Sequence, residues 1–111
     1  MNQVFQAVSD ATRRDILDRL RTEGPLSLTD VAAPLTMTRQ AVAKHLDVLQ
    51  SAGLVTRRQR GRERIHEVRD EPLRSLSDWL APWEAEWDAR LARLKDHVDG
   101  KGEDDDGSSD E

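Results

Sequence analysis

The chain has 111 residues, 36% of them hydrophobic and 35% charged, and a formal net charge of −5, which suits a single domain with a thin core. It contains no cysteine, which excludes disulfides, zinc–thiolate sites and thiol sensors. The N-terminal MNQVFQAVSD lacks the apolar core of a signal peptide, and no stretch approaches the roughly 18 apolar residues of a membrane span. We therefore expect a cytoplasmic protein that does not bind membranes.

Two helices are predicted at the start of the chain, over residues 2–8 and 11–22. Each has one apolar face with helical spacing, formed by Val4, Phe5 and Val8 in the first and by Ile16, Leu17 and Leu20 in the second. Ser9 and Asp10 supply cap and turn chemistry between them, and Gly24-Pro25 ends the second helix.

Two more helices are predicted to begin at the N-caps Ser27 and Thr38. Asp30 follows Ser27 in the manner of a capping box, and Pro34 keeps that helix short. The helix after Thr38 should run to about Ala52, with Gly53 as its C-cap. Its core stripe has i, i+4, i+7 spacing and consists of Val42, Leu46 and Leu49.

Residues 54–60 and 63–69 are predicted to form two strands joined by a turn at Gly61-Arg62. Glu71-Pro72 opens a last helical region, in which Pro82 predicts a kink or two abutting helices. This region has an apolar stripe with steps of three and four residues, formed by Leu76, Leu80, Trp83, Trp87, Leu91, Leu94 and Val98.

The charge of the chain is unevenly distributed. Residues 99–111 contain seven acids and one base, so this segment carries −6 and residues 1–98 are left with +1. We expect a folded domain over residues 1–98 and a disordered acidic tail over residues 99–111, because the tail has almost nothing apolar to bury. The window from Thr36 to His66 carries +5, which is the electrostatic signature of a polyanion-binding surface.

Two short helices joined by a tight turn, followed by a hairpin, form a winged helix-turn-helix. The fold class is thus mainly α with a small β-hairpin wing. With its core stripe turned inward, the helix after Thr38 presents Arg39, Gln40, Ala43 and Lys44 outward. A helix fits the major groove of DNA, where arginine can fork onto guanine and glutamine can pair with adenine. These four residues are the predicted base-reading set.

The hairpin is unusually rich in arginine. Five guanidinium groups on one turn repel each other unless an anion is present, and they suit phosphates or a narrow minor groove. The predicted backbone-contacting set therefore comprises Thr38, Arg57, Arg58, Arg60, Arg62 and Arg64.

Four segments resemble ArsR-type winged-helix repressors of bacteria: SDATRRDIL at 9–17, LTDVAAPLTMTRQAVAKHLDVLQSAGLV at 28–55, GRERIHEV at 61–68 and EPL at 71–73. The resemblance covers roughly residues 3–98. This chain departs from the family at Ala43, often serine, at Ala11, often proline, and at His66, usually aromatic. Because Ala43 lacks the hydroxyl group, one polar DNA contact is lost, and DNA recognition depends more on the neighbouring side chains.

The resemblance implies a homodimer formed by the first and last helices, with one recognition helix per subunit on a pseudo-palindromic operator. The implied interface residues are apolar and comprise Val4, Phe5, Val8, Leu76, Leu80, Trp83, Trp87, Leu91 and Leu94. Trp79, Trp83 and Trp87 are interpreted as dimer core and hinge packing, with an aromatic pocket for a small organic effector as the alternative.

Metal sensing is well known in the family, but this sequence favours a metal-independent member that needs no cofactor. The cysteine sites are impossible, and near the last helix only His97 stands beside Asp96 and Asp99, which is a weak ligand set. His45 is interpreted as a partly buried, hydrogen-bonded histidine, with a pH sensor as the alternative. His66 is interpreted as a half-buried strand residue.

The sequence thus predicts a sequence-specific transcriptional regulator, a repressor or autorepressor. The alternative is a winged-helix module whose basic face binds an acidic protein partner. An enzyme is disfavoured, because the sequence shows no nucleophile–base pair, metal set or glycine-rich phosphate loop.

Overall fold

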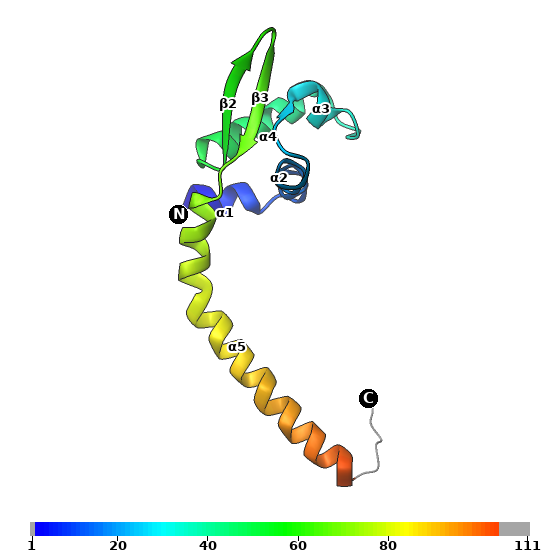
Figure 1. Cartoon of the computed structure of the whole chain (residues 1–111), viewed down its shortest axis with the longest axis vertical. Coiled ribbons are helices and arrows are strands. Elements are labelled where there is room, and N and C mark those ends of the chain that lie inside the picture. Colours follow the sequence, from blue (N-terminus) through cyan, green and yellow to red (C-terminus); the bar gives the residue numbers. More distant parts are fainter. Residues whose placement is uncertain (1, 105–111) are drawn as a thin grey trace. The chain divides into compact units, whose positions relative to one another are not determined.

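A computed structural model describes residues 2–104 of the chain, and its side chains up to Asp96. The chain divides into two units, Met1–Leu76 and Ser77–Glu111. The elements in chain order are α1 (Asn2–Val8), α2 (Ala11–Glu23), β1 (Leu26–Ser27), α3 (Leu28–Ala32), α4 (Arg39–Ser51), β2 (Val55–Arg60), β3 (Glu63–Val68) and α5 (Glu71–Asp104), shown in Figure 1.

The helix boundaries follow from local capping, as the sequence predicted. Asp10, Ser27 and Thr38 each adopt an extended backbone, and each accepts a hydrogen bond from the backbone N–H three residues later. Such bonds satisfy N–H groups that the first helical turn leaves without partners. Gly53, at φ 78°, follows α4 in the left-handed conformation expected of a C-cap glycine.

One core joins the helices to the base of the sheet. Its fully buried large side chains are Ile16, Leu20, Leu46, Leu49, Leu54, Val31, Val42 and Val55. The predicted α4 stripe is therefore confirmed, and so is the apolar face of α2. Together they fix which side of α4 faces solvent.

The sheet has three strands in the order β1-β3-β2, both pairs antiparallel. The predicted hairpin is confirmed, and Gly61 at φ 64° takes the left-handed turn position. The sequence analysis did not predict β1, whose Leu26 and Ser27 pair with His66 and Ile65. This pairing ties the start of α3 to the middle of the wing, defined here as the β2–β3 hairpin.

Helix α5 is continuous through Pro82, so the prediction of two abutting helices is wrong. Proline lacks only its own N–H, and the helix continues on either side of that single missing bond. The backbone of α5 is described to Asp104, beyond the boundary predicted at Val98. The predicted acidic tail, residues 99–111, lies outside the residues whose side chains are described. None of the described helices is long and apolar enough to cross a bilayer.

Candidate nucleic-acid interface

The outer face of α4 carries the predicted base-reading residues. Arg39, Gln40 and Lys44 are exposed, whereas Ala43 is half-buried. The Thr38 hydroxyl caps the helix by accepting from the N–H of Ala41 at 3.1 Å, which holds these side chains at the first turns of a well-formed helix. A helix that enters the major groove contacts bases through such N-terminal residues.

Arg39 is held in place by a residue that the sequence analysis did not single out. Its Nη2 donates to the Oγ1 of Thr29, on α3, at 2.8 Å. Thr29 is exposed and lies ten positions earlier in the chain, so no local pattern pointed to the pair. The bond keeps Arg39 extended and reduces the side-chain entropy that a later contact would cost.

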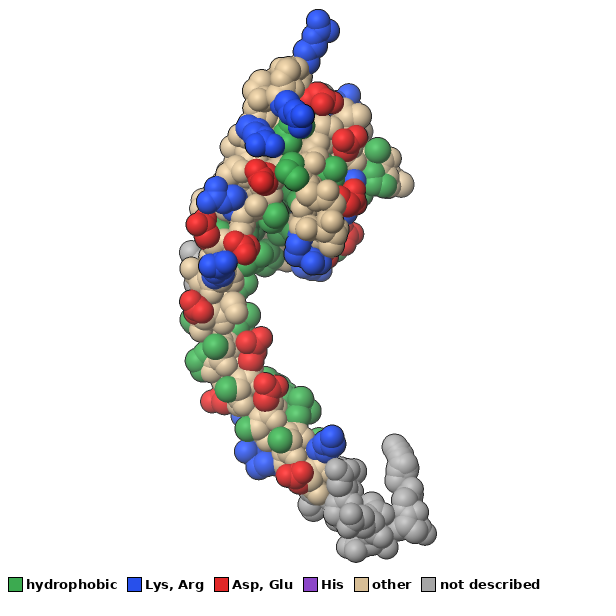
Figure 2. Space-filling view, in the orientation of Figure 1, with side chains coloured by type: hydrophobic (Ala, Val, Ile, Leu, Met, Phe, Trp, Pro, Cys, Tyr) green, Lys and Arg blue, Asp and Glu red, His purple; other side chains and the backbone are tan. Residues whose placement is uncertain are grey.

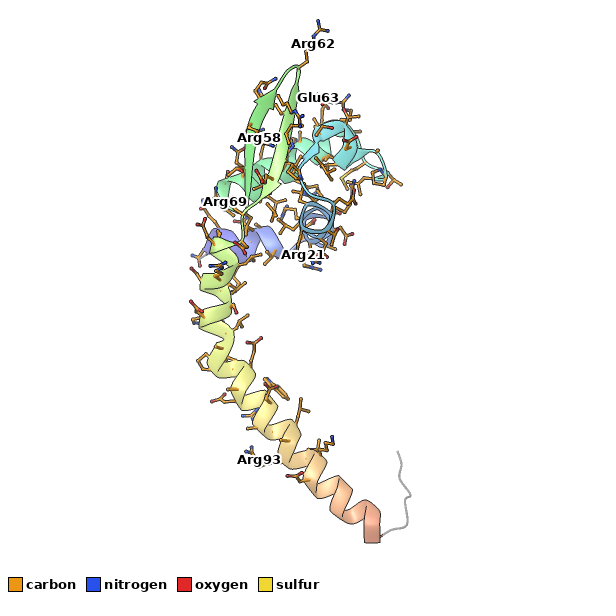
Figure 3. The ribbon with its side chains drawn as sticks, in the orientation of Figure 1. Arg21, Arg58, Arg62, Glu63, Arg69 and Arg93 are labelled. Carbon is orange, nitrogen blue, oxygen red and sulfur yellow. The ribbon has the colours of Figure 1, made fainter. Side chains whose placement is uncertain are left out.

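The wing arginines fall on two faces of the hairpin. In the β2–β3 register Arg57 pairs with His66 and Gln59 with Arg64, whereas Arg58 pairs with Ile65 and Arg60 with Glu63. Because side chains alternate along a strand, Arg57 and Arg64 share one face and Arg58 and Arg60 share the other. Blue Lys and Arg side chains run along this part of the molecule in Figure 2, and Arg62 projects from the hairpin tip in Figure 3.

Arg57 connects the wing to α4. Its Nη1 donates to the Oδ1 of Asp47 at 3.2 Å, and Asp47 is well exposed. The sequence analysis did not predict this pair, whose members lie ten positions apart on separate elements. An exposed ion pair contributes about 0–1 kcal/mol, so it orients Arg57 without removing it from contact with an added anion.

A cavity of about 440 Å³ lies between the outer flank of α4, the start of α3 and the wing. We call it the hollow. Its lining includes Ser27, Thr29, Arg39, Ala43, Arg57, Arg62, Glu63, Arg64 and His66. Helix α4 and one face of the wing thus border a single basic recess.

His66 is more buried than predicted, with 3% of its surface exposed. Its Nδ1 lies 3.3 Å from the carbonyl oxygen of Leu26, and since a carbonyl can only accept, Nδ1 carries the proton. Burial lowers the pKa of His66, and the charges of Arg57 and Arg64 lower it further, against the opposing effects of the Leu26 carbonyl and Asp47. The neutral imidazole is therefore the folded form.

This burial gives the stability a pH dependence. Below its ordinary pKa of about 6.5, His66 takes up a proton in the unfolded chain before it does so in the folded one, so the free energy of unfolding falls with falling pH. We expect the urea midpoint of the wild type to drop more between pH 7.5 and 5.5 than that of His66→Phe, which cannot titrate. Equal drops in both proteins would contradict the assignment.

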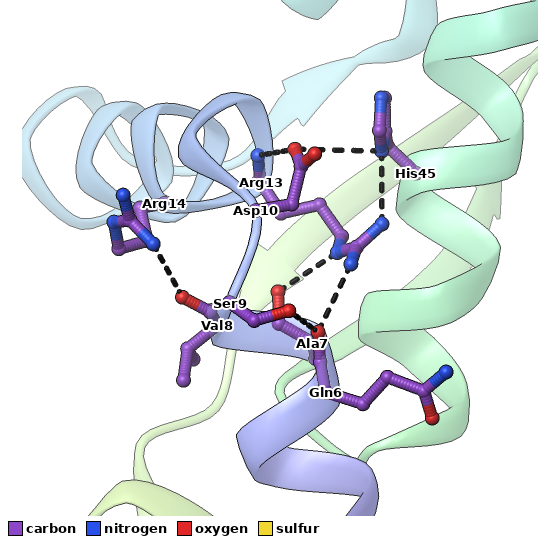
Figure 4. A network of polar contacts seen from close by, with 8 residues as sticks. All are labelled: Gln6, Ala7, Val8, Ser9, Asp10, Arg13, Arg14 and His45. Carbon is purple, nitrogen blue, oxygen red and sulfur yellow. Dashed lines mark hydrogen bonds and ion pairs between the residues drawn. The ribbon is translucent and has the colours of Figure 1, made fainter.

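His45 belongs to a network that ties α4 to the α1–α2 junction (Figure 4). Arg13 donates to the carbonyl oxygens of Ala7 and Gln6 at 2.8 and 2.9 Å, and its Nη1 lies 3.2 Å from Nδ1 of His45. Asp10 lies 3.9 Å from the same ring, and the N–H of Arg13 is the main cause that lowers the pKa of Asp10. The interpretation of His45 as a partly buried, hydrogen-bonded residue is confirmed.

The predicted dimer residues differ in how much of their surface is exposed and so available to a partner subunit. Val4 is already buried within the chain, whereas Phe5 is 41% exposed. Five large apolar side chains along α5 are more than half exposed: Trp79, Trp83, Trp87, Leu91 and Leu94. Val8, Leu76 and Leu80 are half-buried. The rings of Trp79 and Trp83 lie 5.9 Å apart, and Arg90 lies 5.4 Å from the centre of the Trp87 ring.

Within the described part of the chain, no three His or acidic side chains are grouped so that they could hold a metal ion. His97 and Asp99, two of the three weak ligands considered from the sequence, lie outside the residues whose side chains are described.

Comparison with known proteins matches residues 8–58 to a family of helix-turn-helix domains. The chain is 43% identical over 84 residues to an uncharacterized HTH-type transcriptional regulator, YuzN, of Bacillus subtilis, covering 69% of this chain and 91% of the relative. It is 34% identical to the HTH-type transcriptional regulator Rv2034 of Mycobacterium tuberculosis, covering 93% of this chain and 92% of the relative. It is 30% identical to the transcriptional repressor SdpR of Bacillus subtilis, covering 72% of this chain and 88% of the relative.

Two solved structures extend the comparison. An ArsR-like transcriptional regulator from Rhodococcus is 40% identical, with a TM-score of 0.65 over 87% of this chain and 91% of that one. A winged helix-turn-helix domain from Mycobacterium bovis, described as homodimeric and as a possible ArsR-family regulator, is 25% identical, with a TM-score of 0.60 over 73% and 77%. The predicted winged helix-turn-helix fold is confirmed.

Proposed function

This chain belongs to the ArsR family of winged helix-turn-helix transcriptional regulators, and we propose that it acts as a homodimeric repressor that recognises a pseudo-palindromic operator through α4. Each subunit would place one α4 helix in a major groove, with the wing over the adjacent backbone. Because bacterial DNA lies in the cytoplasm, the protein would act there. The proposal gives the chain no enzymatic activity.

The observation that carries the proposal is the outer face of α4. Arg39 and Gln40 stand exposed at the first turn of a capped helix, where the geometry of major-groove recognition needs long hydrogen-bonding side chains. Lys44 lies one turn further along and suits a base edge or a phosphate. Ala43, on the flank toward the wing, is left with an apolar contact, such as a thymine methyl group.

The wing supports the same function. Arg57 and Arg64 face the hollow beside α4, while Arg58 and Arg60 lie on the other face of the hairpin and Arg62 at its tip. Arginines placed this way contact phosphates from several directions and contribute affinity that does not depend on sequence. We assign them to the DNA backbone.

The dimer would form through α1 and α5. A contiguous exposed apolar stripe on a protein surface marks an interaction site, and α5 exposes Trp83, Trp87, Leu91 and Leu94. The Mycobacterium bovis domain, which is described as homodimeric, supports a dimer. Phe5 would join the interface, whereas Val4 would mainly support α1 from within its own subunit.

The test is selection of bound duplexes from a randomised library with the purified protein. We expect one enriched motif with two inverted half-sites, separated by about one helical turn or a multiple of it. The alternative function, binding of an acidic protein by the same basic face, predicts no enriched motif, because a protein partner does not need base-reading residues at the start of α4.

We further propose that the repressor does not respond to metals, because the chain has no cysteine. Micromolar zinc, cadmium or arsenite should leave the affinity for the selected duplex unchanged, as measured by fluorescence anisotropy at neutral pH. Release of the DNA by micromolar zinc would contradict this. Loss of that release in His97→Ala would then identify the ligands near the end of α5 as responsible.

A further inference from the structure

The hollow between α4 and the wing has the size and the lining of a ligand site. Its volume of about 440 Å³ lies within the range of about 300–1,000 Å³ that is usual for small-molecule pockets. Four arginines and one glutamate line it, and the arginines come from α4, both strands of the wing and the turn between them. A recess with this excess of positive charge selects for an anion.

The hydrogen-bonding groups of the hollow are mainly donors. The Thr29 hydroxyl oxygen already accepts from Arg39, and the Ser27 hydroxyl oxygen accepts from the N–H of Asp30 at 3.1 Å. Each hydroxyl therefore keeps its own hydrogen for another acceptor. Ser27 is only 4% exposed and lines the hollow. Among the described residues, no acceptor lies within hydrogen-bond distance of the Arg64 guanidinium.

The number of cationic donors, and their origin in several different elements, favour phosphate over carboxylate. A carboxylate is planar and offers two oxygens, which one guanidinium can occupy side-on. A phosphate offers oxygens in several directions, so guanidinium groups from α4, β2 and β3 can bind it together. The hollow is also walled in part by Leu28, Ala43 and Leu46, which give a sugar an apolar surface to lie against.

We propose that the hollow binds a phosphate ester together with its sugar. The ester has two sources: a backbone nucleotide of bound DNA, or a free nucleotide that would compete with DNA. The inference rests on the proposed function and deepens it, since it makes the hollow a defined phosphate site and predicts that Arg64 and Ala43 matter more than the arginines on the other face of the wing.

The first arm of the test uses no DNA. Amide NMR spectra of the full chain are titrated with adenosine 5′-monophosphate, and with adenosine as the control without phosphate. We expect saturable shifts at Thr29, Ala43 and His66 with the monophosphate only. Arg64→Ala should weaken this binding about tenfold, the loss of one charge-assisted contact, whereas Arg58→Ala removes the same charge from the other face and should change it less than about twofold. Ala43→Leu, which extends an apolar side chain into the hollow and keeps every charge, should weaken it at least as much.

The second arm measures affinity for random-sequence duplex with the same three variants. If the monophosphate binds and displaces the duplex, a free nucleotide is a ligand. If the monophosphate does not bind, but Arg64→Ala and Ala43→Leu weaken duplex binding about tenfold and Arg58→Ala, which removes a backbone contact outside the hollow, weakens it clearly less, the site takes the DNA backbone only. Equal effects of Arg58→Ala and Arg64→Ala in both arms would overturn the proposal. The anion would then be attracted by the overall positive charge of the wing and not bound at a defined site. The first arm uses no DNA, so it tests the phosphate site even if the protein has no operator.

Discussion

Replacing Arg39 and Gln40 together by alanine will remove most of the protein's preference for its operator over random DNA. A bidentate contact between a side chain and a base contributes about 1–3 kcal/mol of discrimination, so the loss of two should reduce the ratio of operator to random affinity at least about thirtyfold. Both side chains are exposed, and the Thr38 cap is retained, so the fold should tolerate the change. The measurement is titration of both duplexes by fluorescence anisotropy.

The chain offers a matched control for this experiment. Arg21, on α2, is exposed and pairs with Asp18 at 3.5 Å, so Arg21→Ala removes the same charge away from α4 and should leave the ratio unchanged. Arg60→Ala and Arg62→Ala should weaken binding to both duplexes alike and flatten its salt dependence. If these wing variants changed sequence preference and the α4 variant did not, the two roles would be reversed.

Replacing Trp83 and Trp87 together by glutamate will produce monomers that bind the operator about a hundredfold or more weakly. The two tryptophans lie on the apolar stripe of α5 and are 53% and 58% exposed in the single chain. Charges there would have to be desolvated in a dimer interface. A monomer also loses the avidity of two linked recognition helices, which commonly contributes two to four orders of magnitude.

The control for charge is Ala85→Glu combined with Ala92→Glu. These positions lie on the opposite side of α5 by helical spacing, so the same two charges are added away from the stripe. Sedimentation should give twice the mass of one chain for the wild type and this control, and the mass of one chain for the tryptophan variant. A tryptophan variant that stays dimeric would exclude the α5 stripe as the interface.

Much of this fold could be predicted because its signals are local. The caps at Ser27 and Thr38 and the stripe of Val42, Leu46 and Leu49 each lie within a few residues of the helix that they define. The exposed face of α4 then follows from helical geometry alone. The candidate base-reading side chains were therefore correctly placed on the surface, apart from the half-buried Ala43.

The features that the sequence did not reveal depend on contacts between distant residues. Strand β1 has two residues, too few for any periodicity, and exists through its pairing with β3 some 40 positions later. The partnerships of Arg39 with Thr29 and of Arg57 with Asp47 likewise join separate elements. The division of the wing arginines between two faces became clear only with the strand register.

Proline and histidine gave weaker signals for a different reason. Pro82 removes one hydrogen bond, and a long helix can absorb that loss, so the residue alone does not decide between a kink and a break. The burial of His66 depends on elements far from it in the sequence, such as β1, whose Leu26 carbonyl oxygen lies 3.3 Å from its ring. A strand pattern fixes alternation but not what packs above each face.

The central claim is that this chain recognises DNA sequence through α4, and the most direct test is the ratio of its affinities for the selected operator and a scrambled duplex of the same length and composition. At near-physiological salt the account predicts at least about a thousandfold tighter binding to the operator, with affinity for both duplexes falling steeply as salt rises. Equal affinity for the two duplexes at every salt concentration would contradict it.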